Sequence, residues 1–226
     1  MFDGKFRQSV DSRTAPVGQA LVKMGFNADV LTASGLVFAF ITAVLIGVGY
    51  HGWAILALIL TGAHDLFDGP VAKASQSASK RGAFFDSVTD RLSDSMLLGG
   101  VAYFLVAQHR GELVLLPFAI MTTTFLISYE RSKAESLGIP AKGGLMERAE
   151  RMIVLGVALI ASVLFVPVLW LLLALTAGTA LGRFMRVWNA ANEQSGREPV
   201  TWHRRPRRHS TPTHSRWRGL SRSSRP

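Results

Sequence analysis

The sequence contains no cysteine, which excludes both a disulfide framework and a thiolate metal site. Charge is also scarce, since Asp, Glu, Lys and Arg make up 18% of the 226 residues, against about 25% in soluble domains. Residues 1–25 lack an apolar core followed by a small-residue cleavage site, so we expect no cleavable signal peptide. Hydrophobic residues reach 49% and gather in long runs. This composition is typical of an integral membrane protein.

Five uncharged apolar stretches carry most of these residues: 31–50, 53–63, 95–108, 113–129 and 152–182. The last would form a helix of about 46 Å, too long for a single crossing of a hydrocarbon core of about 30 Å. We therefore expect two helices there, at about 147–165 and 168–189, with a turn at Pro167 because proline interrupts a helix. The prediction is an all-α polytopic membrane bundle with six transmembrane helices, preceded by an N-terminal interfacial amphipathic helix.

Basic residues predict how this bundle is oriented. With six spans, almost every Lys and Arg outside the spans falls on one side, and such residues favour the cytoplasmic side. Both termini are therefore expected in the cytoplasm of a multi-pass cell-membrane protein. We expect a cytoplasmic interfacial helix at residues 1–26, the six-span domain at 27–190, and a disordered Arg-rich cytoplasmic tail at 191–226. From residue 195 onward there are nine arginines and one glutamate, which supply most of the net charge of +10.

Four aspartates are spaced as two pairs on helix faces. Asp65 and Asp68 are three residues apart at the end of the second expected span, and Asp86 and Asp90 are four apart at the start of the third. Because the connection is short, we expect the two helices to be neighbours and the carboxylates to converge near the cytoplasmic surface. Close carboxylates repel and are costly near a membrane, and a divalent cation offsets both effects. Oxygen ligands favour Mg²⁺.

A simpler interpretation pairs these aspartates with nearby cations as interfacial charges. The candidate partners are Lys73, Lys80, Arg81 and Arg91. Asp94 continues the Asp86 and Asp90 face, and we expect it to pair with Arg91. Gly69 and Gly82 beside the carboxylates favour a ligand site, since a glycine lets a ligand or a backbone approach closely.

The motif resembles that of the CDP-alcohol phosphotransferases, D-x₂-D-G-x₂-A-R-x₈-G-x₃-D-x₃-D. The chain matches it at Asp65, Asp68, Gly69, Ala72, Gly82, Asp86 and Asp90, with Lys73 where that family has Arg. The resemblance implies transfer of a phosphatidyl group from CDP-diacylglycerol to an alcohol, with release of CMP. It also implies a homodimer.

The resemblance implies residue roles as well. Two metal ions, Mg²⁺ or alternatively Mn²⁺, would be held by Asp65, Asp68, Asp86 and Asp90. Asp90 would also act as the general base on the acceptor hydroxyl. The CDP-lipid would contact Gly69, Lys73 and Gly82.

A second segment indicates the acceptor. Residues 128–135 and 143–151 resemble the bacterial phosphatidylinositol-phosphate synthases, whose pattern there is S-Y-x-K-x-R-A-E followed by G-G-x-x-E-R-x-E-R, although Arg131 and Lys133 stand exchanged relative to it. The resemblance implies an inositol phosphate acceptor. Its phosphate would be bound by Arg131, Lys133, Arg148, Arg151 and Arg183.

Three alternatives remain open at this point. Glycerol 3-phosphate would also suit a basic acceptor pocket. A membrane metal transporter would place carboxylates near the middle of the membrane on several helices, whereas here they lie toward one surface. The Arg-rich tail would suit a nucleic-acid-binding membrane anchor, although anionic lipid headgroups are the nearer partner, so we expect no specific nucleic acid. Deleting residues 195–226 would separate that reading from a transferase.

Overall fold

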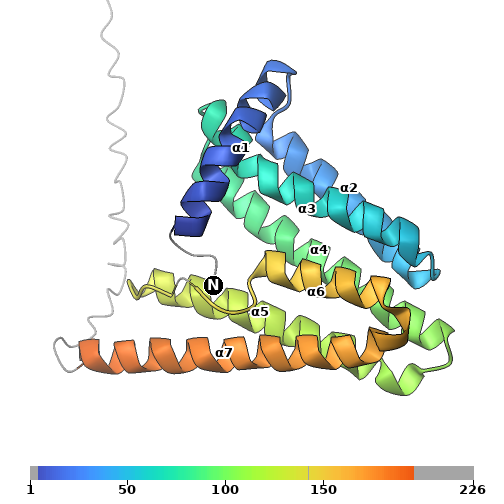
Figure 1. The fold of residues 1–226 in the computed structure, drawn as a ribbon. Helices are drawn as coiled ribbons and strands as arrows, with labels where there is room; N and C mark the ends of the chain where they lie inside the picture. Colours follow the sequence, from blue (N-terminus) through green and yellow to red (C-terminus); the bar gives the residue numbers. More distant parts are fainter. Residues whose placement is uncertain (1–4, 142, 196–226) are drawn as a thin grey trace, which may run out of the picture.

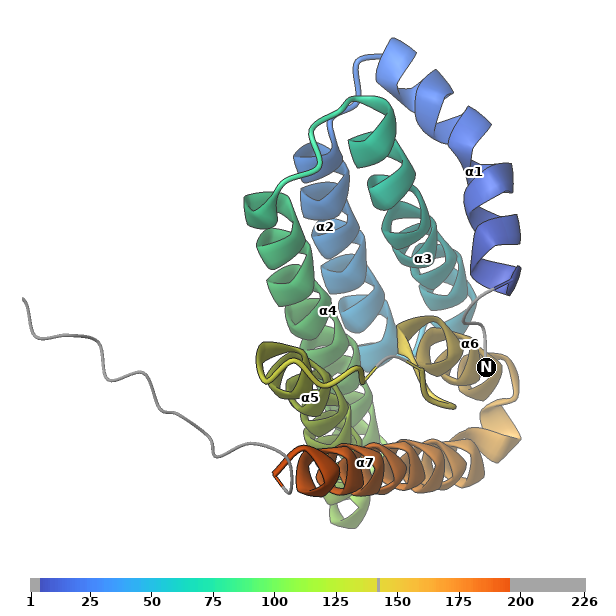
Figure 2. The same ribbon diagram turned by 90° about the vertical axis from the view of Figure 1, so that its left-hand side faces the viewer.

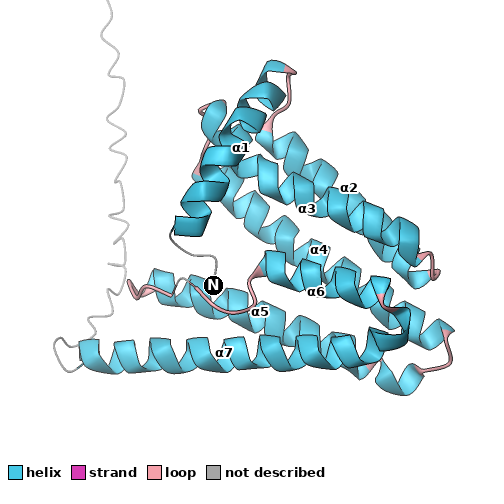
Figure 3. Cartoon of the chain, in the orientation of Figure 1, coloured by secondary structure: helices cyan, strands magenta, loops and turns pink. Residues whose placement is uncertain are grey.

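The computed structural model describes residues 5–141 and 143–195, and within them the chain is helical, with loops but no strand (Figures 1 and 3). The helices are α1 (Lys5–Lys23), α2 (Ala28–Gly47), α3 (His51–Ala74), α4 (Lys80–Ala107), α5 (Leu115–Ser136), α6 (Arg148–Ile160) and α7 (Phe165–Ser195). Two short 3-10 turns, η1 (Gly111–Leu113) and η2 (Ser162–Leu164), precede α5 and α7. The all-α prediction is confirmed for this part of the chain. The predicted tail lies largely outside the described residues.

Helices α2, α3 and α4 form one group, seen side by side in Figure 2. Helix α2 packs against both α3 and α4, and a Cβ at Gly100 of α4 would overlap the backbone of Ala43. Helices α3 and α4 contact each other through side chains, since the rings of His51 and Phe104 lie 4.8 Å apart between centroids, while their backbones stay further apart. The expectation that the two helices are neighbours is therefore met by side-chain contact, with α2 packed against both of them.

Helices α5 and α7 form a second group and lie side by side in Figure 1. Helix α4 joins the two groups through α5, and α6 bridges them by packing on α3 and α7. A continuous apolar core fills these contacts, with Ile46, Leu58, Val101, Ile120 and Leu169 among its buried members. Thr123 of α5 also donates a hydrogen bond of 2.9 Å to Thr176 of α7. Hydroxyl bonds of this kind help helices associate in lipid.

Four helical segments of the described chain are long and apolar enough to cross a membrane: Ala28–Gly47, His51–Ala74, Gly111–Ser136 and Ser162–Glu193. Helix α4 carries the charged aspartate segment, and α6 has 13 residues, or about 20 Å. The described structure therefore confirms an all-helical chain with four candidate spans, and the number six stays a prediction. A helix is present in the N-terminal segment, but its interfacial position stays a prediction.

The break in the long C-terminal apolar run differs from the prediction. The chain leaves α6 at Ala161, passes through η2, and begins α7 at Phe165, so Pro167 lies within the first turn of α7. Proline is tolerated there because the first turn of a helix has no intrahelical acceptor for its N–H groups. The predicted turn at Pro167 is therefore wrong by about one helical turn.

Candidate active site

The start of α4 fixes the position of two predicted site residues. Ser79 caps this helix, since its Oγ accepts a hydrogen bond of 3.0 Å from the Gly82 backbone N–H. Asp86 and Asp90 then follow on one face of α4, while Asp65 and Asp68 lie on the last turns of α3. The backbones of α3 and α4 stay apart, so the carboxylates meet because their side chains reach toward one another.

The four carboxylates are brought together. The Asp68 and Asp86 side chains are close enough to hydrogen-bond to each other, and Asp65 lies within electrostatic range of both Asp68 and Asp86. Thr32 of α2 donates a hydrogen bond of 3.4 Å to Asp68 Oδ2. Two carboxyl groups this close repel unless a proton or a cation lies between them. Thr32 was not predicted, because nothing in the local sequence around it indicates this contact.

Arg148, at the start of α6, lies between two of the carboxylates. Its Nη2 is 2.7 Å from Asp65 Oδ2, and its Nη1 pairs with Asp90. Arg91 adds a second cation to Asp90, at 3.3 Å. The structure therefore places Arg148 against predicted metal ligands, whereas the sequence assigned it to the acceptor phosphate. That role stays a prediction.

The donor set suits a hard divalent cation, because all four side chains offer carboxylate oxygens and two of them already crowd each other. In the described residues, however, no three carboxylate or imidazole groups are gathered tightly enough to enclose an ion. The positive charge of Arg148 compensates part of the cluster in this arrangement. The residues thus fit a metal by the chemistry of their donor atoms.

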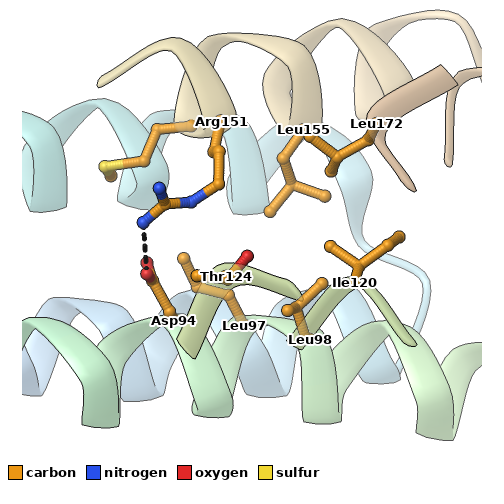
Figure 4. Close-up of a pocket in the computed structure, with 9 residues that line it drawn as sticks. Asp94, Leu97, Leu98, Ile120, Thr124, Arg151, Leu155 and Leu172 are labelled. Atoms are coloured by element: carbon orange, nitrogen blue, oxygen red, sulfur yellow. Dashed lines mark hydrogen bonds and ion pairs between the residues drawn. The ribbon is translucent and has the colours of Figure 1, made fainter. Parts of the chain in front are cut away.

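Arg151 pairs with Asp94, one turn beyond Asp90 on α4 (Figure 4). The Arg151 Nη2 donates to Asp94 Oδ2 over 2.7 Å, and its Nη1 donates to the Met146 carbonyl over 3.2 Å. The expected pairing of Asp94 with Arg91 is wrong. Arg91 instead bonds the Ser87 carbonyl and Asp90, since its side chain turns back along its own helix.

Arg183 of α7 is buried, with 2% of its surface exposed. It donates to the Ile127 carbonyl at 2.7 Å and the Gly143 carbonyl at 3.0 Å, and it lies within electrostatic range of Arg131. Arg131 itself pairs with Glu135, one turn along α5, and Lys133 is exposed. The predicted acceptor cations are thus divided between the carboxylate cluster and the α5–α7 contact.

Arg186 is a further cation of α7 that was not predicted as a site residue. It lies one turn beyond Arg183 and donates to the same Gly143 carbonyl, at 3.2 Å. The i, i+3 spacing of Arg183 and Arg186 on one helix was the available signal for this arrangement.

The residues predicted to contact the CDP-lipid differ in their surroundings. A Cβ at Gly69 would meet no atom of the described residues within 4 Å, so this face of α3 is open. Gly82 serves the cap of α4, and a Cβ there would sit 3.4 Å from Ser79 Oγ. Lys73 lines a cavity of about 220 Å³ between α1 and α3.

This helical fold, with four candidate membrane spans and a partly buried cluster of carboxylates and arginines, is that of a membrane protein with a charged site. The family model for CDP-alcohol phosphatidyltransferase matches residues 26–192. The chain belongs to the CDP-alcohol phosphatidyltransferase family, and it is an enzyme of that class.

Several curated relatives of this chain share one name. The phosphatidylinositol phosphate synthase of Mycobacteroides abscessus is 31% identical over 150 residues, which cover 66% of this chain and 68% of the relative. The enzyme of the same name from Corynebacterium glutamicum is 32% identical over 143 residues, covering 62% and 65%.

A solved structure shares the fold as well. The crystal structure of Mycobacterium tuberculosis phosphatidylinositol phosphate synthase with CDP-DAG bound has a TM-score of 0.68 at 27% identity, covering 77% of this chain and 93% of that one. A second structure of that enzyme, in complex with manganese and citrate, has the same TM-score and identity.

Proposed function

We propose that this enzyme transfers the phosphatidyl group of CDP-diacylglycerol to the hydroxyl of inositol phosphate, giving phosphatidylinositol phosphate and CMP. The observation that carries the proposal is the gathering of Asp65, Asp68, Asp86 and Asp90 in a chain of this family. The named relatives and the CDP-DAG complex support the choice of both substrates.

In the reaction, the acceptor oxygen attacks the lipid-side phosphorus of the pyrophosphate. A new P–O bond forms, the P–O bond to CMP breaks, and CMP leaves with the bonding electrons. Asp90 takes the proton of the acceptor hydroxyl, which requires an ionised carboxylate. In the structure Asp90 pairs with Arg148 and Arg91.

We propose that Asp65, Asp68, Asp86 and Asp90 hold two divalent ions, Mg²⁺ or Mn²⁺. Bound there, such ions would neutralise the negative charge that the pyrophosphate develops as CMP leaves. The manganese complex of the Mycobacterium tuberculosis enzyme supports a divalent metal. Gly69, Lys73 and Gly82 would contact the CDP-lipid, with the open face over Gly69 leaving room for it.

The acceptor phosphate would be bound by Arg131, Lys133, Arg148, Arg151 and Arg183. Arginine is suited to this role because its planar fork binds phosphate oxygens in pairs. They come from three helices: Arg148 and Arg151 of α6 pair with carboxylates of α3 and α4, while Arg183 of α7 lies near Arg131 of α5.

We further propose that α4 and α6 also cross the membrane, which gives six spans with both termini and the active site in the cytoplasm. Residues 1–26 would form the interfacial segment, 27–190 the catalytic domain and 191–226 the cytoplasmic tail. A homodimer would complete the assembly.

One assay tests the reaction. Purified protein is incubated with labelled CDP-diacylglycerol, Mg²⁺ and a panel of alcohols, and CMP release is measured. We expect the highest kcat/KM with inositol phosphate. A preference for glycerol 3-phosphate would mean that the acceptor is a different phosphorylated alcohol, while the transfer reaction stays as proposed. CMP release with free inositol alone would show that the acceptor carries no phosphate.

A further inference from the structure

We propose that Asp94 is a positioning residue for acceptor binding, which acts by holding the Arg151 guanidinium beside the carboxylate cluster. This inference rests on the proposed function, because that function assigns Arg151 to the acceptor phosphate. Asp94 lies outside the seven motif positions, and its partner comes from a helix 57 residues further along the chain.

The geometry fixes Arg151 from two sides. Asp94 Oδ2 accepts from Nη2 at 2.7 Å and the Met146 carbonyl accepts from Nη1 at 3.2 Å. Both members of the ion pair are nearly buried, with side-chain exposures of 10% for Asp94 and 11% for Arg151. In so little solvent the guanidinium depends on these partners, so its orientation is set before any substrate arrives.

The pair faces apolar side chains on one side, and on the other Asp94 lies within electrostatic range of Arg148 and Asp65. Beside it lies a cavity of about 20 Å³, lined mostly by apolar side chains that include Leu97, Leu98, Ile120 and Leu155 (Figure 4). A hydrophobic pair of similar volume would pack against such a wall at least as well. In the described structure α4 and α6 make no close backbone contact, so Arg151 reaches across to Asp94 by its side chain. Compared with a hydrophobic pair, the buried charge pair fixes the orientation of the Arg151 guanidinium.

The neighbouring carboxylates explain why a dedicated partner is needed. Asp90 lies one turn before Asp94 on α4, and Arg148 lies one turn before Arg151 on α6. Arg148 takes Asp65 and Asp90, while Arg151 takes Asp94. In the described structure the carboxylate that Arg151 contacts is that of Asp94. Asp94 therefore keeps one arginine of α6 free of the proposed metal ligands.

A double-mutant cycle tests this assignment with Asp94→Asn, Arg151→Gln and the double variant. Asp94→Asn preserves size and removes the charge. We expect each single variant to raise the KM for inositol phosphate about tenfold or more, with the KM for CDP-diacylglycerol within about twofold of wild type. The double variant should match Arg151→Gln alone, because Asp94 acts through Arg151.

Thr124→Val is the matched control within the same cavity. The Thr124 hydroxyl is buried and has no hydrogen-bond partner among the described residues. The control should leave both KM values unchanged, whereas a general packing role for the cavity would move them. Melting temperatures of all variants separate loss of fold from loss of acceptor binding. If Asp94→Asn proves too unstable to purify, Asp94→Glu keeps the charge but displaces the guanidinium, and it should show the same rise and the same non-additivity.

The outcomes are distinguishable. An unchanged acceptor KM in the Asp94 variant, with a raised KM in Arg151→Gln, overturns the positioning role and leaves the proposed function standing. Additive effects in the double variant also overturn it, since Asp94 would then act independently of Arg151. An unchanged acceptor KM in Arg151→Gln overturns both the acceptor assignment and the positioning role.

Discussion

At the scale of single residues, the crowding of Asp68 and Asp86 has a direct functional consequence. Asp86→Asn removes one of two carboxylates that lie within hydrogen-bonding distance and that we assign to metal binding. We expect CMP release to fall at least about a hundredfold, because a lost metal ligand removes several kcal/mol of transition-state stabilisation. Activity is measured alongside the melting temperature in detergent.

Glu112→Gln provides the matched control, since Glu112 is an exposed carboxylate in η1, at the opposite end of α4. It should keep wild-type CMP release. Wild-type turnover in Asp86→Asn would contradict the metal assignment.

Arg183 makes a second prediction at this scale. Arg183→Met keeps the apolar length of the side chain but leaves the Ile127 and Gly143 carbonyls without this donor. The Gly143 carbonyl keeps Arg186 as a second donor, so the main loss is the buried charged bond to Ile127, and the free energy of unfolding should fall by about 1.5–3 kcal/mol. Arg186→Met, the exposed neighbour one turn away, should cost less than about 1 kcal/mol. Equal melting temperatures for the two variants would show that the buried bonds contribute little.

Some features of the site can be predicted from the local sequence, and others cannot. Asp65, Asp68, Asp86 and Asp90 follow from helical spacing and a motif, both of which are local properties, and the structure gathers them. The partner of Asp94 could not be found in this way, because the local rule favours Arg91 whereas the actual partner is Arg151. Such pairings are set by how α4 and α6 lie in space.

At the scale of helices, the contact between α2 and α4 depends on one missing side chain. A Cβ at Gly100 would overlap the Ala43 backbone, whereas a Cβ at Gly99 would meet nothing within 4 Å in the described structure. Gly100→Ala should therefore separate the two helices and cost about 1–3 kcal/mol. Gly99→Ala should be neutral or stabilising, since alanine favours helix by up to about 1 kcal/mol. Thermal unfolding in detergent compares them, and an equal response of the two would refute the close approach.

Helix identities were largely predictable, but helix ends and neighbours were not. Uncharged runs predict most of the apolar helices because burial in lipid requires them. The break at residues 161–164 was misplaced, since Pro167 is compatible with a first helical turn as well as with a loop. The packing of α2 against both α3 and α4 was not predicted, because a short connection limits the distance between two helices without fixing which other helix packs on them.

At the scale of the whole molecule, the absence of cysteine makes the topology directly testable. A single cysteine introduced in the C-terminal tail is the only thiol in the protein. We expect it to be shielded from an impermeant thiol reagent applied outside intact cells, because the tail is rich in arginine and basic segments stay in the cytoplasm. A cysteine at Gly111, in the loop between α4 and α5, should be labelled. The reverse pattern would invert the topology, and labelling of both would change the number of spans.

The shortness of α6 has a consequence for the lipid around the enzyme. At about 20 Å, this helix falls well short of a hydrocarbon layer of about 30 Å, and Arg148 and Arg151 stand at its first turn. Such a mismatch is relieved when the bilayer thins locally around the helix. The charged end of α6 then lies closer to the centre of the bilayer, and water can reach it. In proteoliposomes of short-chain phosphatidylcholine, CMP release should therefore be faster than in long-chain lipid at equal protein content, with Asp86→Asn as the blank. A rate independent of chain length would mean that neighbouring helices, rather than the lipid, absorb the whole mismatch.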